Sequence, residues 1–263
     1  MGNQILTRRG LLRAAAIGGA GLAVAGCNVL DGLGASGHPL RDVMEGANTL
    51  TYRVHRFLMA PDALAKEYTK ADIRQPMFPN GVAAPPDADY KALAANSFKG
   101  YRLGVGGLVD KPLSLDRETL FAMPSRTQIT RHDCVEGWSC IAEWTGVPLS
   151  VILQEARPKP QARFVLIRCF DTIERGLSGE FKYYESIDMI DAYHPQTILA
   201  YGLNGGPLPV ENGAPLRLRV ERQLGYKMAK YVRSIELVSS FAQIEGGKGG
   251  YWEDRGYDWY AGI

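Results

Sequence analysis

The stretch RHDCVEGWS, residues 131–139, lies near the middle of the 263-residue chain and joins two predicted elements. Residues 127–133 alternate as a β-strand does, and residues 139–144 predict a short helix that ends at Gly146. Cys134 is therefore expected where a strand ends and a helix begins. Such a junction presents backbone N–H groups and side chains outward, so it is a common place for a ligand or a nucleophile.

The Cys134 thiol has two interpretations. Nearby N–H groups would lower the pKa of its thiol and make it a metal ligand or a nucleophile. A buried structural thiol is the alternative, and the local sequence alone favours that alternative. Cys140 is expected to pack in the short helix and Cys169 in the core, either free or in one disulfide. Apart from Cys27 near the N-terminus, these two and Cys134 are the chain's cysteines, an odd number, so at least one is free or a ligand.

Outside this stretch, short strands alternate with short helices. Residues 51–59 (TYRVHRFLM) predict a strand or an extended arm, and residues 72–89 are rich in proline and predict a loop. Further strands are expected within residues 101–113, 163–170, 215–220 and 234–238, a helix at 150–156, and a hairpin over 198–208 around Asn204-Gly205. This mixture predicts an α+β single domain with a mixed sheet.

The N-terminus predicts export. Thr7-Arg8-Arg9-Gly10-Leu11-Leu12 is a twin-arginine pattern, and the apolar run that follows it is too short to cross a bilayer. The run ends in Val24-Ala25-Gly26-Cys27, which fits a lipobox and predicts lipidation of Cys27; an unlipidated signal peptide is the alternative. We therefore divide the chain into a signal peptide (1–27), a flexible tether (28–48) and a folded domain (49–263). The expected location is the periplasm, anchored to a membrane as a lipoprotein.

Charge excludes one class of partner. The first 27 residues hold three arginines and no acid, so 27 basic and 28 acidic residues remain. A net charge near −1 gives no reason to expect nucleic acid as a partner. The chain also lacks the paired C-x-x-C of zinc and iron–sulfur sites and the C-x-x-C-H of a covalent haem.

The segment around Cys134 resembles the metal-ligand region of the sulfite-oxidase-type molybdopterin oxidoreductases. It is most similar to the branch that contains the periplasmic methionine-sulfoxide reductase catalytic subunit. The resemblance spans roughly residues 50–263 and continues, in the family's order, through WTGVPL (144–149), FDT (170–172), YES (184–186), HPQT (194–197), NGAPLR (212–217) and GYKMAK (225–230). It implies a sulfite-oxidase-type fold and a molybdenum–molybdopterin cofactor with Cys134 as catalytic residue and metal ligand.

The resemblance also implies a set of cofactor-binding residues. These are Thr172, Asn212, Arg217, Met228, Ala229 and Lys230, with His55 or Arg56 of the early arm on the pterin. The arm departs from the sequence of the reductase branch, which leaves the last two positions in doubt. Arginine gives bidentate bonds to phosphate, and successive amides hold an anion, so these residue types suit a pterin phosphate.

Structural alternatives stand beside these assignments. Arg217 and Arg219 alternate with leucines, so one of them could belong to the solvated face of a half-buried strand. Lys227 and Lys230 could be surface lysines. His132 and Asp133 could shape substrate access. The aromatic tail from Tyr251 to Tyr260 is expected to pack rather than to form a substrate cage.

The function implied is oxygen-atom or two-electron transfer on a small molecule. Val-Glu-Gly-Trp follows Cys134 where a sulfite oxidase typically has Ala-Gly-Asn-Arg, which disfavours sulfite and favours a neutral substrate such as a sulfoxide. The expected partners are the twin-arginine export machinery and a separate electron-transfer protein, either a membrane haem protein or a cytochrome c. We expect a monomer. The alternative is a non-catalytic exported lipoprotein that binds a small ligand.

Overall fold

A computed structural model describes residues 39–176 and 179–263. Two compact units are distinguished, Met1–Thr51 and Tyr52–Ile263. The predicted signal peptide and Cys27 lie outside the described residues. Within the described part of the chain, no helix is long and apolar enough to cross a membrane.

Helix α3 (Pro39–Leu58) replaces the strand predicted for residues 51–59, and that prediction is wrong. The helix also includes the second half of the stretch expected to be a tether. The β-branched and aromatic residues misled the prediction, because tertiary contacts override such local preferences. Within the second unit, Tyr52, His55 and Arg56 are spaced as one face of a helix and are partly buried.

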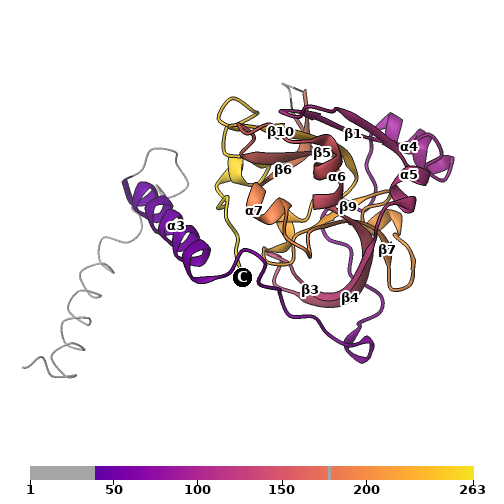
Figure 1. Cartoon of the computed structure of the whole chain (residues 1–263), viewed down its shortest axis with the longest axis horizontal. Coiled ribbons are helices and arrows are strands. Elements are labelled where there is room, and N and C mark those ends of the chain that lie inside the picture. Colours follow the sequence, from indigo (N-terminus) through magenta and orange to yellow (C-terminus); the bar gives the residue numbers. More distant parts are fainter. Residues whose placement is uncertain (1–38, 177–178) are drawn as a thin grey trace, which may run out of the picture. The chain divides into compact units, whose positions relative to one another are not determined.

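The first sheet is mixed and has the order β2-β1-β10-β5-β6 (Figure 1). Strand β1 pairs in parallel with β10, and the other neighbours are antiparallel. Its strands are β1 (Arg102–Gly107), β2 (Leu113–Asp116), β5 (Phe164–Gly176), β6 (Gly179–Asp188) and β10 (Val232–Val238). The strands predicted within 101–113, 163–170 and 234–238 are confirmed.

The second sheet is antiparallel, with the order β3-β4-β7-β8 and β9 paired to β7. Its strands are β3 (Arg126–Asp133), β4 (Ser139–Pro148), β7 (Ile198–Leu203), β8 (Gly206–Pro207) and β9 (Arg217–Arg219). The predicted hairpin at Asn204-Gly205 is confirmed as the β7–β8 turn, where φ is +50° and +79°. Asparagine and glycine tolerate these left-handed values better than other residues do.

Short helices connect and cover the two sheets. The α-helices are α4 (Ala88–Ala95), α5 (Arg117–Ala122), α6 (Leu149–Ala156) and α7 (Met189–Ala192); the 3₁₀ turns are η2 (Lys70–Asp72), η3 (Val210–Asn212), η4 (Gly225–Lys227) and η5 (Glu253–Arg255). Helix α6 confirms the helix predicted at 150–156. One hydrophobic core links both sheets, with Trp144 and Leu153 fully buried. The α+β, mixed-sheet prediction is confirmed.

Two local predictions near Cys134 and Arg217 are wrong. Residues 139–144 belong to strand β4, because buried Cys140, Ala142 and Trp144 recur with a period of two. Cys134 therefore lies in a β3–β4 hairpin loop, where Gly137 has φ +88°. All three residues of strand β9 are buried, so neither Arg217 nor Arg219 lies on a solvated face. The strand is present, but the prediction that it is half-buried is wrong.

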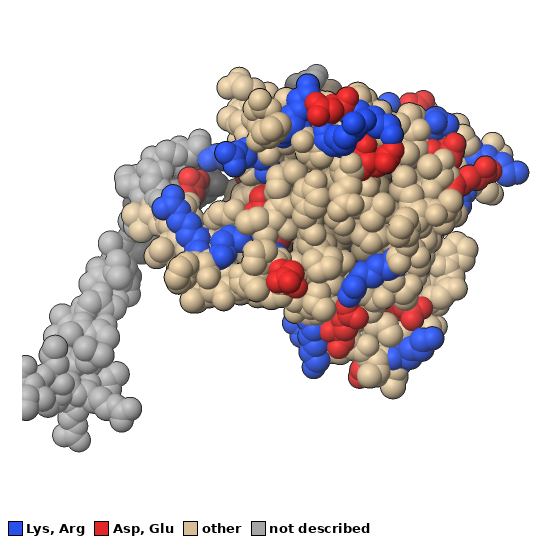
Figure 2. Space-filling model, viewed as in Figure 1, with Lys and Arg blue, Asp and Glu red and all other residues tan. Residues whose placement is uncertain are grey.

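The surface in Figure 2 shows basic and acidic side chains interspersed around a broad uncharged area. On this face they do not separate into large patches of one sign. The absence of nucleic acid as a partner remains a prediction from the charge balance.

Candidate functional site

A pocket of ≈ 440 Å³ opens beside the β3–β4 loop. Its lining comes from six stretches that are distant in sequence, and includes Cys134, Met228, Ala229 and Lys230. A volume in this range is usual for a small-molecule or cofactor site. The structure thus brings four of the residues predicted for the site to one cavity.

Cys134 is partly buried at the start of the hairpin loop, where its N–H donates to the Trp138 carbonyl at 2.9 Å. Burial raises the pKa of the Cys134 thiol above its ordinary value. A backbone hydrogen bond from Glu136 and the charge of Arg217 act in the opposite direction and are outweighed. The predicted lowering of this pKa is therefore wrong for the cofactor-free chain. A bound metal cation would deprotonate such a thiol directly.

Arg217 is fully buried and forms no salt bridge among the described residues. Its guanidinium donates to the Asn212 carbonyl at 3.1 Å and to Oδ1 of Asn80 at 3.0 Å, and its Nε has no partner there. Burial, followed by repulsion from Arg219, lowers the pKa of Arg217 to about 9. A buried charge without a counter-ion is costly, so the site needs an anion.

Lys230 is likewise a buried cation whose hydrogen-bond partners are neutral. Its ammonium donates to the carbonyls of Val82 and Glu211 at 2.6 and 2.9 Å and has no carboxylate within salt-bridge distance in the described chain. Burial and the charge of Arg217 lower the pKa of Lys230 to about 7. Gly213 has φ +117°, and a Cβ there would lie 3.0 Å from Lys230 and 3.2 Å from Arg217. Glycine therefore lets the two cationic side chains pass close to one another.

Two arginines on β9 differ in their partners. Arg219 pairs in a bidentate manner with Glu221, at 2.9 and 2.7 Å, and donates to Nδ1 of His132 at 2.9 Å. Because arginine only donates, His132 Nδ1 accepts and the proton lies on Nε2. That buried Nε2 has no partner among the described residues. Burial lowers the pKa of His132 well below its usual range, so the ring is neutral.

Asp171 also lines the pocket and is almost fully buried. Its Oδ1 has no hydrogen-bond partner in the described structure. Burial raises the pKa of Asp171 to about 7. Asp171 thus brings an unpaired carboxyl oxygen to the pocket, whereas the unpaired donors of Arg217 and His132 belong to residues outside its lining.

Thr172 and Asn212 lie next to the pocket rather than in its lining. Thr172 is buried between two lining residues, Asp171 and Ile173, and its hydroxyl donates to Glu180 at 3.2 Å. Asn212 is buried behind Arg217, to which its carbonyl is bonded.

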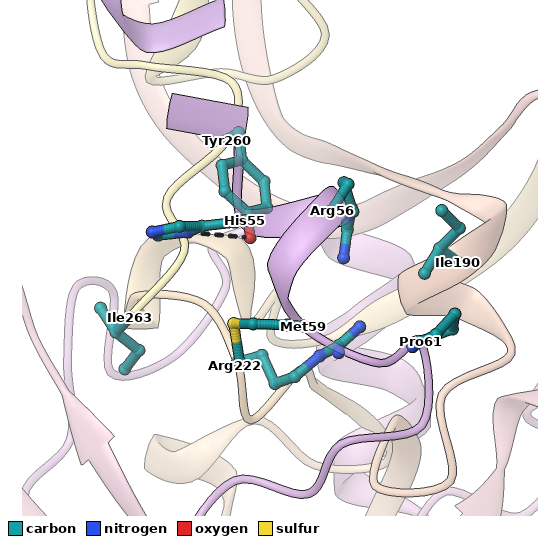
Figure 3. Close-up of a pocket in the computed structure, with 8 residues that line it drawn as sticks. All are labelled: His55, Arg56, Met59, Pro61, Ile190, Arg222, Tyr260 and Ile263. Atoms are coloured by element: carbon teal, nitrogen blue, oxygen red, sulfur yellow. Dashed lines mark hydrogen bonds between the residues drawn. The ribbon is translucent and has the colours of Figure 1, made fainter. Parts of the chain in front are cut away.

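His55 and Arg56 lie at a different, smaller cavity, shown in Figure 3. Arg56 is fixed by ion pairs with Asp188 and Asp191 at 2.8 and 2.7 Å, and His55 lies 3.4 Å from the Tyr260 hydroxyl. None of the residues that line this cavity lines the Cys134 pocket. Their predicted role on the pterin stays a prediction that the geometry of this structure does not favour.

Sequence reasoning missed several lining residues. Asn80, Gly81 and Val82 were assigned only to a loop, although an Asn-Gly pair permits close approach of the backbone to a ligand. Tyr183, Tyr226, Trp252 and Tyr257 also line the pocket, and of these Trp252 and Tyr257 belong to the tail that was expected only to pack. No local signal separates such rings from ordinary core residues.

The oxidoreductase molybdopterin-binding domain family matches residues 91–243, which include Cys134, Arg217 and Lys230. The chain belongs to this family. It is an oxidoreductase, and its mixed α+β domain has the molybdopterin-binding fold of the sulfite-oxidase type.

Among its relatives is a protein of Azospira oryzae that is named as a candidate protein-methionine-sulfoxide reductase subunit, YedZ1. The two are 35% identical over 260 residues, which cover 98% of this chain and 89% of that protein. The protein-methionine-sulfoxide reductase catalytic subunits MsrP of Xanthomonas axonopodis and Gluconobacter oxydans are each 39% identical, over 58% and 52% of this chain. Those matches span about half of the relatives' length, 49% and 47%.

A solved structure with partial similarity is the sulfane dehydrogenase SoxCD of Paracoccus pantotrophus. It has a TM-score of 0.48 and 28% identity, over 53% of this chain and 38% of that chain.

The donor set fits the cofactor that the family implies. Lys230 lines the pocket and Arg217 is bonded to the lining residue Asn80, so both cations lack a counter-ion where a pterin phosphate could bind, and Asp171 offers an unpaired acceptor. Cys134 lies in the same pocket with a thiol suited to a soft, high-valent metal.

Proposed function

We propose that this chain holds a molybdenum–molybdopterin cofactor and reduces a sulfoxide to the corresponding sulfide. The observation that carries the proposal is the pair of buried, uncompensated cations, Arg217 and Lys230, beside the pocket of Cys134. Cys134 would be the protein's ligand to the metal. The cofactor, when bound, supplies the two-electron chemistry.

The chain's own residues would do four things. Arg217 and Lys230 bind the anionic end of the cofactor, and Asn212 orients Arg217 through its carbonyl. Met228 and Ala229 form part of the pocket wall next to Lys230. Asp171, whose pKa is raised to about 7, can hold a proton inside the pocket at neutral pH. Thr172 is the next residue of strand β5 and would help to hold Asp171 in place.

A sulfoxide is favoured over an oxyanion by the charge beside Cys134. Glu136 is exposed at the mouth, where it accepts from the Trp138 indole at 2.9 Å, and it would repel sulfite. The overall reaction takes up two electrons and two protons, breaks the S=O bond and releases sulfide and water. The names of the relatives, which include protein-methionine-sulfoxide reductase subunits, point to the same substrate class.

The electrons must come from a separate redox protein. A membrane haem protein is the favoured donor, with a soluble cytochrome c as the alternative. We further propose export by the twin-arginine route, lipidation at Cys27 and a periplasmic, membrane-anchored monomer. Export, lipidation and membrane anchoring are proposed from the N-terminal sequence alone.

The test is metal and pterin analysis of the full chain matured in a molybdenum-competent host. Wild type should contain molybdenum and pterin in near-stoichiometric amounts and reduce methionine sulfoxide with a reduced dye. Cys134→Ser should lose that activity and change or lose its metal signal. Cys140→Ser is the matched control, because Cys140 does not line the pocket of Cys134; if it folds, it should leave both readouts intact. Well-folded wild type without molybdenum would refute the proposal.

A further inference from the structure

Five aromatic rings pack in a contiguous chain at the pocket, and we call this chain the aromatic wall. Its members touch in sequence: Tyr226 and Tyr257 (5.2 Å between centroids), Tyr257 and Trp252 (5.3 Å), Trp252 and Tyr251 (5.2 Å), Tyr251 and Tyr183 (5.9 Å). All but Tyr251 line the pocket that holds Cys134. Ring pairs at these separations are mutually stabilising. The wall is therefore a preformed surface and not a set of isolated side chains.

Two of the three pocket-lining tyrosines of the wall, Tyr183 and Tyr226, use their hydroxyls within the protein. The Tyr226 hydroxyl donates to the Asp258 carbonyl at 2.6 Å, and the Tyr183 hydroxyl donates to the Tyr226 carbonyl. Both hydroxyls are thus used within the protein. Polar side chains line the same pocket, and one of them, Lys230, shares its segment with Tyr226; these side chains are Asn80, Cys134, Glu136, Asp171 and Lys230. The lining therefore combines polar side chains with aromatic rings.

We propose that the aromatic wall binds the carbon substituents of the sulfoxide, namely the methyl and methylene groups beside the sulfur of a methionine sulfoxide side chain. This inference rests on the proposed function. A sulfoxide has one polar end, its oxygen, and an apolar remainder. Its oxygen belongs on the side of Cys134, and its carbon groups belong on the rings.

The electrostatics of aromatic rings selects this occupant over an oxyanion. Ring faces are negative and attract polarised C–H groups and sulfur, whereas they repel anions. Tyr257 is 40% exposed, so the wall reaches from the pocket to the surface. A methionine sulfoxide side chain can enter along the wall while the peptide that carries it stays outside.

A buried ionic triad holds the wall in place. Lys227 lies between Glu185 and Glu253, with its ammonium 2.6 Å from a carboxylate oxygen of each. All three are essentially inaccessible to solvent. Each member is next to the wall in sequence: Lys227 follows Tyr226, Glu253 follows Trp252, and Glu185 is two residues beyond Tyr183 on β6. The triad thus fixes three segments that carry wall residues.

The test is steady-state kinetics of the cofactor-loaded full chain with two sulfoxides, a methionine-sulfoxide peptide and dimethyl sulfoxide. Trp252→Ala should raise KM for the peptide about tenfold, as expected from loss of an aromatic contact. It should leave kcat within about twofold and change KM for dimethyl sulfoxide much less. Tyr257→Ala, at an exposed position that tolerates truncation, should act in the same direction. Trp252→Phe should restore most of the peptide KM.

Phe121→Ala is the matched control, because Phe121 is an exposed ring that packs on Tyr201 away from the pocket lining. Metal and pterin content is measured in every variant, so that loss of cofactor is not taken for loss of substrate binding. An unchanged KM for the peptide in both alanine variants would refute substrate binding by the aromatic wall while leaving the proposed function intact. Loaded wild type that reduces neither sulfoxide would overturn both.

Discussion

Two lysines three residues apart occupy opposite electrostatic environments. Lys227 is bound by two buried carboxylates, and these neighbours raise its pKa against the opposing effect of burial. Lys230 is bound by backbone carbonyls, and its pKa is lowered to about 7. On β9 the same contrast separates Arg219, paired with Glu221, from Arg217, bonded to Asn212 and Asn80.

The difference separates a structural region from a binding region. Where a buried cation stabilises the fold, the chain supplies its counter-ion. Where the described residues supply only neutral hydrogen-bond partners, the cation suits the anionic ligand proposed above. The contrast is available only from the structure, because all four side chains are basic and lie within one short stretch of sequence.

The largest effect should come from removing the compensated lysine. Lys227→Met leaves Glu185 and Glu253 facing each other in the core and should lower the free energy of unfolding by about 3–5 kcal/mol. Lys230→Met should cost much less, because losing two hydrogen bonds to carbonyls is offset by relief of repulsion with Arg217. Urea unfolding of the cofactor-free full chain measures both. Equal losses would contradict the division into two regions.

A smaller effect is expected on cofactor retention. Arg217→Gln removes charge-assisted hydrogen bonds worth about 1.5–3 kcal/mol, so affinity for the pterin should fall about 10- to 100-fold. Pterin released on denaturation is quantified by fluorescence. Arg233→Gln is the control, since Arg233 is partly exposed on β10 and does not line the pocket. Retention of full pterin content by the Arg217 variant would show that the unpaired charge serves another purpose.

The uncompensated region should also give the empty chain an unusual pH dependence. The pKa of Lys230 is lowered to about 7, so between about pH 7 and 10.5 the unfolded chain holds a proton that the folded chain has lost. Stability therefore rises with pH in that window, by at most about 1.4 kcal/mol per unit. Lys230→Met should abolish this part of the slope.

Asp171 should have the opposite effect on the pH dependence of stability, and at lower pH. Its pKa is raised to about 7 from 3.8, so between these values the folded chain holds a proton that the unfolded chain has lost. Stability falls as pH rises through that window, and Asp171→Asn should remove the fall. Together the two groups predict a stability minimum near neutral pH in the cofactor-free chain. If the stability of wild type varied with pH as that of Lys230→Met and Asp171→Asn does, the assignment of the two slopes to Lys230 and Asp171 would be refuted.

The smallest effect is expected at a compensated but exposed pair. Lys111 and Glu155 form a salt bridge at the surface. Lys111→Met should leave the urea midpoint unchanged, because solvent already screens both charges. A clear shift of the urea midpoint would mean that ion pairing, rather than burial, determines the loss of stability expected for Lys227→Met.

Elements with a strong local pattern were predictable. The β7–β8 hairpin followed from Asn204-Gly205, and β10 and α6 followed from apolar periodicity. The short strand after Cys134 was mistaken for a helix, since Ser-Cys-Ile-Ala-Glu-Trp contains good helix formers and its alternation is visible only once the buried positions are known. The error at residues 51–59 was the reverse. Their β-type composition predicted a strand, but the segment belongs to helix α3, which shows that such composition is a weak guide.

The site was predictable where a resemblance supplied the positions. Cys134, Met228, Ala229 and Lys230 converge on one pocket, whereas His55 and Arg56 lie at another. The direction of the Cys134 pKa could not be predicted, because it depends on burial by segments far apart in sequence. The role of Trp252 and Tyr257 was hidden for the same reason: tail residues reach the pocket only through tertiary structure.

The close approach of Arg217 and Lys230 past Gly213 has a consequence for maturation. Without an anion the two charges repel each other inside the core, so the empty chain is the less stable form. A ligand that binds only the folded state stabilises it by mass action. If the cofactor proposed above binds here, its insertion would double as quality control: proteases that degrade partly open chains would remove empty molecules before loaded ones.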